Sequence, residues 1–255
     1  MTLGELLQLL RGPILNDRTD RISGTSDYLW TDETLVTYIN EAQRKFASQG
    51  LVLRDGTTDE VTKVTLVEGQ STYILHDSIL AVMSAKVEGQ DVDLNRVGHA
   101  VLAAYRAPTE SWVDPASLSA LPPGSPLAYS TDEGLQSFDS DGLSQITLRV
   151  HPVPATAQDG SVIRLRVLRK PIDKLVVGSL SASPEIPEDY HIEMLDWAAY
   201  MALRIVDDDA GSPKRAADFK ATFEENVKKA RTEVLRKLFA PIEWGFGRGG
   251  FSWSN

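Results

Sequence analysis

The sequence contains no cysteine among its 255 residues, which excludes disulfide bonds, cysteine metal ligands and a catalytic thiol. It also has no run of about 20 apolar residues, the length that a membrane-spanning helix needs. The first residues, Met1–Pro13, lack the basic start of a secretory signal, and polar residues interrupt their apolar run. We therefore expect neither a membrane partner nor export by a signal peptide.

Basic residues are in the minority, because 26 lysines and arginines stand against 36 aspartates and glutamates, for a formal net charge of −10. A protein that grips nucleic acid neutralises phosphates with a basic surface. The composition therefore argues against tight binding of DNA or RNA. It leaves room for DNA that passes nearby without being held.

Catalytic and metal-binding patterns are missing as well. The position four residues after His191 holds Leu195, so the paired histidines of a zinc protease are absent and His191 is expected at the surface near a helix start. Asp91, Asp93 and Asn95 begin like a calcium loop, but the required glycine and glutamate do not follow. The sequence predicts no catalytic residue, metal or cofactor, and an enzyme built from scattered serines and aspartates remains an alternative.

Two amphipathic helices are predicted in the last third of the chain. Pro187 suits the first turn of one helix, and the acidic run Asp207–Asp209 ends it. Ser212 can cap a second helix, which begins at Pro213 and ends before Pro241. The apolar stripes, at helical spacing, are Ile192, Leu195, Ala199, Ala202 and Val206 in the first helix and Phe219, Phe223, Val227, Ala230, Val234 and Leu238 in the second.

Two further helices are predicted near the N-terminus. A short one covers Thr2–Leu10 and is expected to end at Gly12–Pro13. In the longer one, Thr31 is a suitable N-cap and Gly50 a suitable C-terminal residue. The stripe of the longer helix comprises Leu35, Ile39, Ala42 and Phe46.

From Val61 onward the apolar residues alternate as they do in strands. Glycine turns at Glu68–Gln70 and Val87–Asp91 predict two hairpins, and Ser144–Val150 with Val162–Leu168 is the clearest strand pair. The remaining predicted segments are strands at Ile79–Val87, Val101–Tyr105, Leu127–Ser130 and Gly134–Phe138 and a proline-rich loop at Ala107–Pro126.

The order of helices, strands and helices predicts an α+β fold, with a helical bundle built from both chain ends, an inserted antiparallel β domain and an extended C-terminal tail. The expected parts are residues 1–55 and 181–240 for the two halves of the bundle, 56–180 for the β domain and 241–255 for the tail. Neither half can bury its apolar stripe alone. The expected bundle core contains Leu35, Ile39, Phe46, Leu195, Ala199, Phe219 and Phe223.

The tail concentrates large aromatic side chains among glycines and serines. These are Trp244, Phe246, Phe251 and Trp253, with Arg248 adding a charge. Such a segment is adhesive when it is free. It either packs back on its own β domain or, in the interpretation that we favour, fills pockets on another chain as a docking strap.

The run of Asp207, Asp208 and Asp209 opposes the helix dipole at the C-terminus of the preceding helix. It forms either a hydrated turn or an acidic patch that faces a basic partner or a cation. Local physics does not decide between these alternatives.

Two segments resemble the head-to-tail adaptor proteins of tailed phages. Tyr28–Gln49 carries the pattern Trp-x-Asp-Glu-x-Leu-x-x-Tyr-Ile-Asn-Glu-Ala-Gln. Ile186–Ala230 carries Ile-Pro-x-x-Tyr-His, then Asp-Trp-Ala-Ala-Tyr and an Asp-rich turn before the next helix. Both patterns occur in the family's order around a variable β region.

The resemblance implies a structural virion protein that forms a ring of about twelve copies between the portal and a downstream tail or nozzle protein. The ring would lie in the neck of the virion after assembly in the host cytoplasm, and DNA would pass through its lumen without sequence-specific binding. The C-terminal strap would dock on the portal. Asp207–Asp209, or glutamate-rich helix faces, would lie near the channel or a subunit interface.

A different class of function is an oligomeric binding module. In that alternative the β domain recognises a glycan or a host or tail surface, and the helices only hold the copies together. Aromatic residues of the β region, such as Trp112 and Tyr129, would then need to be exposed.

Overall fold

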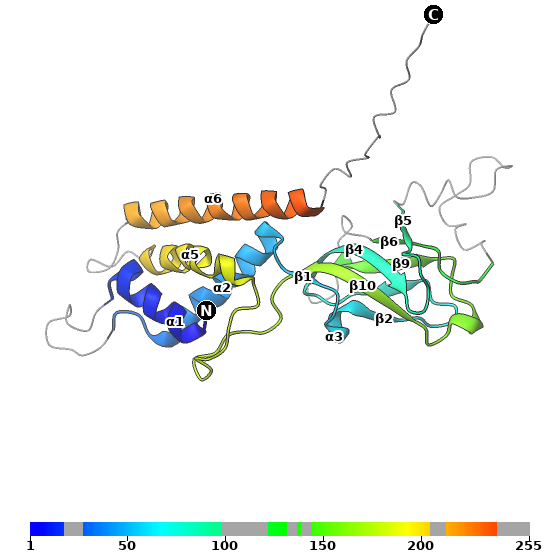
Figure 1. The fold of residues 1–255 in the computed structure, drawn as a ribbon. Coiled ribbons are helices and arrows are strands. Elements are labelled where there is room, and N and C mark those ends of the chain that lie inside the picture. The colour runs from blue at the N-terminus through cyan, green and yellow to red at the C-terminus, as the bar shows by residue number, and fades with distance from the viewer. Residues whose placement is uncertain (18–27, 98–121, 132–136, 139–143, 205–212, 239–255) are drawn as a thin grey trace, which may run out of the picture.

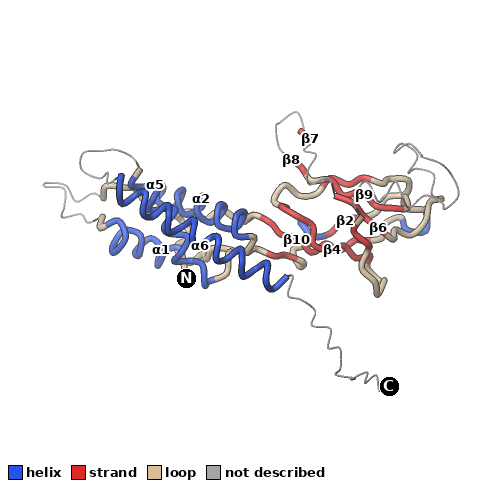
Figure 2. The backbone as a smooth tube through the Cα atoms, turned by 90° about the horizontal axis from the view of Figure 1, so that it is seen from above, coloured by secondary structure: helices blue, strands red, loops and turns tan. Residues whose placement is uncertain are grey.

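The computed structural model describes residues 1–17, 28–97, 122–131, 137–138, 144–204 and 213–238. The molecule is elongated, with a helical bundle at one end and β-sheets at the other (Figure 1). A view turned by 90° shows the same two parts side by side along one long axis (Figure 2). The α+β class and the bundle built from both chain ends are confirmed.

The bundle combines helices from the two ends of the chain. Its elements are α1 (Leu3–Leu9), the π-helical segment η1 (Leu10–Leu15), α2 (Asp32–Gly50), α5 (His191–Leu203) and α6 (Pro213–Leu238), with a short 3-10 turn, η4 (Glu188–Tyr190), before α5. Thr31 caps α2, as predicted, because its side chain accepts a hydrogen bond from the N–H of Thr34. Thr2 and Glu5 form a capping box on α1.

The bundle core lies where α2, α5 and α6 meet. Phe223 is fully buried, with its ring centroid 5.8 Å from that of Phe46 and 5.2 Å from that of Trp197. Of the residues expected in the core, Leu35, Ile39, Phe46, Leu195, Ala199 and Phe223 are buried, and Phe219 is partly buried against them. Three helices therefore share one aromatic centre that no single stripe could enclose.

Of the two helix ends predicted near the N-terminus, the first is wrong and the second is confirmed. The chain stays helical through Gly12 and Pro13 and ends only at Asn16, whose φ is +56°. The wider π turn accommodates the proline there. Helix α2 ends at Gly50, as predicted, and Leu51 after it takes the left-handed position with φ +56°.

The buried face of α5 differs from the predicted stripe. Ile192 is 61% exposed, whereas Met194, Trp197 and Ala198 are buried. The helix packs against α2 on one side and α6 on another, so its buried surface is wider than one stripe. It also ends at Leu203, before the predicted Val206, and Val206 itself lies outside the described residues.

The β part consists of two sheets that enclose a second core. In the first, β10 (Val162–Arg169) pairs with β4 (Ile79–Val87) on one edge and with β1 (Arg54–Asp55) and β2 (Lys63–Thr65) on the other. The second has the order β3 (Thr72–Ile74), β9 (Thr147–His151), β6 (Ala128–Thr131) and β5 (Asn95–Arg96). The smaller elements are α3 (Asp59–Thr62), η3 (Thr156–Gln158) and the pair β7 (Ser137–Phe138) and β8 (Ser144–Gln145).

The predicted strand pairing is wrong in three places. The turn at Gly69 forms, with φ +76°, but β2 and β3 on either side of it join different sheets. The turn at Gly89 also forms, yet β5 pairs with β6 in parallel, so the second sheet is mixed. Finally, β9 and β10 lie in opposite sheets. In the first and third cases both strands have buried apolar residues, and sending them to facing sheets buries both sets in one core.

Candidate interaction surfaces

A single guanidinium group connects the bundle to the sheets. Arg169, the last residue of β10, places its Nε 2.6 Å from Oδ2 of Asp55 in β1. Its Nη1 lies 2.5 Å from Oε2 of Glu185, in the segment that leads to α5. The side chains of Arg169, Asp55 and Glu185 are only 11%, 4% and 18% exposed. We call these three residues the junction cluster.

The other carboxylate oxygens of the junction cluster are occupied by backbone N–H groups. Asp55 Oδ1 accepts hydrogen bonds from Thr57 and Thr58 at 2.9 Å and 3.0 Å. Burial alone would raise the pKa of Asp55, but these backbone hydrogen bonds and the Arg169 guanidinium hold that pKa well below its usual range. Asp55 therefore stabilises the fold above its ordinary pKa, and this contribution is lost only in strong acid.

Glu185 binds the chain that leaves β10. Its Oε1 accepts hydrogen bonds from the N–H groups of Ile172 and Asp173 at 2.6 Å and 2.7 Å. The bundle and sheet cores are separate clusters of buried residues. The junction cluster thus lies where the two parts meet and joins β1 and β10 to the segment that leads to α5.

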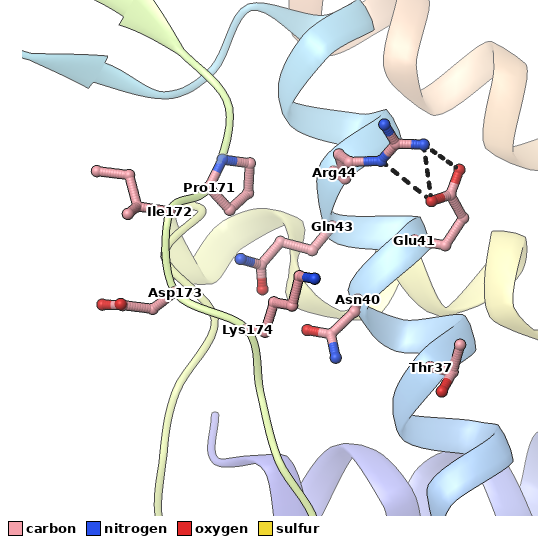
Figure 3. A pocket seen from close by; sticks show the side chains of 9 residues that line it. All are labelled: Thr37, Asn40, Glu41, Gln43, Arg44, Pro171, Ile172, Asp173 and Lys174. Carbon is pink, nitrogen blue, oxygen red and sulfur yellow. Dashed lines mark hydrogen bonds and ion pairs between the residues drawn. The ribbon is translucent and has the colours of Figure 1, made fainter. Parts of the chain in front are cut away.

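A groove of about 490 Å³ runs beside α2, between this helix and the segment after β10 (Figure 3). We call it the α2 groove. It is lined by Thr37, Asn40, Glu41, Gln43 and Arg44 of α2 and by Pro171, Ile172, Asp173 and Lys174. On its rim Arg44 is paired with Glu41 at 3.0 Å.

Two side-chain amides of α2, those of Asn40 and Gln43, line this groove. The carboxamide of Asn40 forms two hydrogen bonds with the backbone of Leu175, at 2.8 Å and 2.9 Å, and so ties the segment to the helix. Gln43 is 1% exposed and its side chain points toward the segment (Figure 3). Its Oε1 is buried without a hydrogen-bond partner among the described residues.

A partly buried carboxylate lies between α5 and α6. Asp196 of α5 accepts a long hydrogen bond, 3.4 Å, from the side-chain amide of Asn226 in α6. Burial, and then the nearby carboxylate of Glu193, raise the pKa of Asp196 to about 6. The carboxylate of Asp196 is therefore less favourable at this helix contact than in water, and ionising it at neutral pH costs folding free energy.

Replacing Asp196 with asparagine is expected to stabilise the protein at pH 8 and to change little at pH 4. A carboxyl whose pKa is raised in the folded state stabilises that state in acid, and the contribution is lost as the pH rises through about 6. Discounted for partial exposure, the gain in unfolding free energy is about 1–2 kcal/mol at pH 8. Urea unfolding at both pH values measures it, and the exposed Asp218→Asn on α6 is the control. An equal effect of Asp196→Asn at pH 4 and pH 8 would contradict the assignment.

The tail aromatics Trp244, Phe246, Phe251 and Trp253, with Arg248, and the acidic run Asp207, Asp208 and Asp209 all lie outside the described residues, as do Trp112 and the strand Val101–Tyr105. In the described part of the chain, no group of three histidine, cysteine or acidic side chains is placed to hold a metal ion. That part also contains no helix long and apolar enough to cross a membrane.

Two expectations about side-chain exposure are wrong. His191 is buried, at 3% exposure, and its Nε2 lies 2.9 Å from the carbonyl oxygen of Ile186, because the turn before α5 folds over it. Burial lowers the pKa of His191. Tyr129 is 1% exposed in the sheet core, so it cannot serve as the exposed aromatic that the binding-module alternative requires.

A comparison with known protein families identifies the family of this chain. The model of the SU10 adaptor protein family matches residues 1–242. The chain belongs to this family. A comparison with curated proteins gave no match. The family match confirms the resemblance to adaptors, and it identifies a structural protein of phage particles rather than one of a catalytic family.

In this adaptor the structure explains the residues of the N-terminal pattern that resembles the family. The Tyr-Ile-Asn-Glu-Ala-Gln stretch of α2 supplies Ile39 to the core and Asn40, Glu41 and Gln43 to the α2 groove. The sequence identified the helix but not the contact of the Asn40 amide with Leu175, because these two residues are 135 positions apart. The junction cluster was missed for the same reason.

Proposed function

We propose that this adaptor forms a ring of about twelve copies between the portal and the tail of a phage particle, with a lumen that continues the DNA channel. The family match over residues 1–242 carries this proposal. The formal charge of −10 supports it, because a conduit that neutralised phosphates would retard the DNA. The neck of the virion is the corresponding location, and a downstream tail or nozzle protein is the partner on the other side.

Two separate clusters of buried residues support a division of roles within the chain. Residues 1–55 and 181–240 form the ring-building bundle, and residues 56–180 form the inserted β domain that faces outward or toward the tail. Residues 241–255 dock on the portal through Trp244, Phe246, Phe251 and Trp253, with Arg248 as a charged contact. Asp207–Asp209 lie at the channel or at a subunit interface.

Deleting residues 242–255 tests the docking role. The truncated protein is expected to stay folded, because no described core residue is removed, and to lose binding to purified portal by at least about tenfold. Sedimentation of portal mixtures measures binding, and circular dichroism measures folding. A full-length variant with the four tail aromatics changed to serine separates loss of the side chains from loss of length. Portal binding that survives both changes would overturn the docking role.

A further inference from the structure

Helix α6 has the opposite charge from the rest of the chain. Its 26 residues carry eight basic and four acidic side chains, a formal charge of +4. The rest of the chain keeps 18 of the 26 basic residues and 32 of the 36 acidic ones, so that its formal charge is −14. An isolated basic helix on an acidic protein is a strong electrostatic asymmetry.

The excess positive charge of α6 lies on its exposed face. Glu225 and Glu233 are paired within the helix with Lys229 and Lys237, at 2.8 Å and 2.6 Å. The exposed side chains of Lys228, Arg231 and Arg236 have no ion-pair partner among the described residues. We call these three residues the α6 basic face. The opposite face of the helix packs in the bundle core. Its buried residues are Phe223, Val227, Ala230 and Val234.

The charge of α6 determines which contacts it can make with a second copy. Two α6 helices placed against each other would bring like charges together, which is unfavourable. The basic face of one copy is instead complementary to a different, acidic or mixed surface of the next. Such a head-to-tail contact generates a ring when it closes, and a ring of about twelve copies needs two contact surfaces about 150° apart around the subunit.

One wall of the α2 groove, the segment after β10, lies on the other side of the bundle from α6. Helix α6 runs along the top of the bundle in Figure 1, and the segment between β10 and α5 descends along its opposite side. This side has open charged and apolar groups, because Asp173 and Lys174 have no ion-pair partner among the described residues. Val176 and Leu180 of the same segment are 54% and 50% exposed.

The groove also contains an unfilled hydrogen-bonding position. The buried Oε1 of Gln43 lacks a donor within the described part of the chain, and leaving a buried acceptor without a partner is unfavourable. Basic side chains are donors without acceptors. An arginine or lysine side chain that enters the groove comes close to the carboxylates of Asp173 and Glu41. Its N–H donors then also lie near Gln43, which lines the same groove.

We infer that the α6 basic face of one copy docks in the α2 groove of the next copy, and that this contact closes the ring. The inference rests on the proposed ring and adds which two surfaces build it. Lys228 and Arg231 meet Glu41 and Asp173 across the interface. Glu224 of α6, whose ion pair with Lys220 is long at 3.9 Å, meets Lys174. DNA, the other polyanion in the proposed assembly, is not the partner of α6.

Charge reversal with rescue tests this contact. The wild-type chain, Lys228→Glu/Arg231→Glu, Glu41→Lys/Asp173→Lys and the variant with all four changes are compared by native mass spectrometry, alone and with portal. Each double variant is expected to raise the concentration for half assembly at least tenfold, and the fourfold variant to recover most of that loss. Arg166→Glu on β10 and Glu60→Lys on α3 are exposed controls that leave assembly unchanged. Circular dichroism verifies folding of every variant.

The outcomes separate this inference from the proposed function. A wild-type ring that both double variants also form with unchanged concentration dependence would overturn the α6–groove contact and leave the ring standing. A wild-type chain that forms no ring, alone or on the portal, would overturn both. Rings of Lys228→Glu/Arg231→Glu that form normally but retain less 30-base-pair duplex DNA than wild type would show that α6 is a DNA surface and also overturn the inference.

Discussion

Replacing Arg169 with methionine is expected to lower the free energy of unfolding by about 3–5 kcal/mol. The guanidinium is the shared partner of Asp55 and Glu185, both largely buried, and methionine leaves the two carboxylates without their cation. The expected effect exceeds that of a surface ion pair because neither carboxylate can turn into solvent while its second oxygen is bound to backbone N–H groups. Urea unfolding at pH 7 measures the change.

The control is Arg166→Met, three residues earlier on the same strand. Arg166 is exposed and has no ion-pair partner in the described part of the chain, so its replacement is expected to change stability by less than about 0.5 kcal/mol. Neutralising the whole cluster, as Arg169→Met with Asp55→Asn and Glu185→Gln, is expected to recover part of the loss. Equal effects of Arg169→Met and Arg166→Met would show that the junction cluster does not stabilise the fold.

Replacing Phe223 with alanine is expected to cost about 3–5 kcal/mol of unfolding free energy. Phe223 is fully buried at the meeting point of α2, α5 and α6, where its ring contacts those of Phe46 and Trp197. Its removal leaves a cavity between three helices that cannot all move inward. Thermal or urea unfolding, monitored by tryptophan fluorescence, measures the loss of unfolding free energy.

Phe219→Ala provides the matched comparison. It removes the same side chain one turn earlier on α6, from a position that is only partly buried. Its cost is expected to be less than half that of Phe223→Ala, because both the transfer term and the cavity term scale with burial. If the two variants are equally destabilised, the aromatic centre of the bundle is not at Phe223.

The helices of the bundle could be predicted because their signals are local. Thr31 caps α2 with its own side chain, Pro213 begins α6, and the spacing of Leu35, Ile39 and Phe46 marks one face of a helix. The width of the buried face could not be predicted in the same way. Met194 and Trp197 are buried on α5 because a second helix covers them.

Strand pairing was less predictable than strand position. The strand Ile79–Val87 was predicted with its observed limits, and the turns at Gly69 and Gly89 formed. A turn fixes the direction of the chain over a few residues. Whether the strands on either side stay together or separate into two sheets depends on apolar partners far along the chain.

The interaction surfaces also divide into features that depend on local sequence and features that depend on long-range contacts. The sequence by itself determined the elements, the family resemblance, the aromatic composition of the tail and the excess of basic residues in α6, because each depends on residue type and short-range spacing. Only the tertiary structure brought Asp55, Arg169 and Glu185 together and placed the groove of α2 across the bundle from α6. Asp55 and Arg169 are 114 positions apart and Arg169 and Glu185 are 16 apart, and no local rule of capping, periodicity or turn formation constrains such contacts.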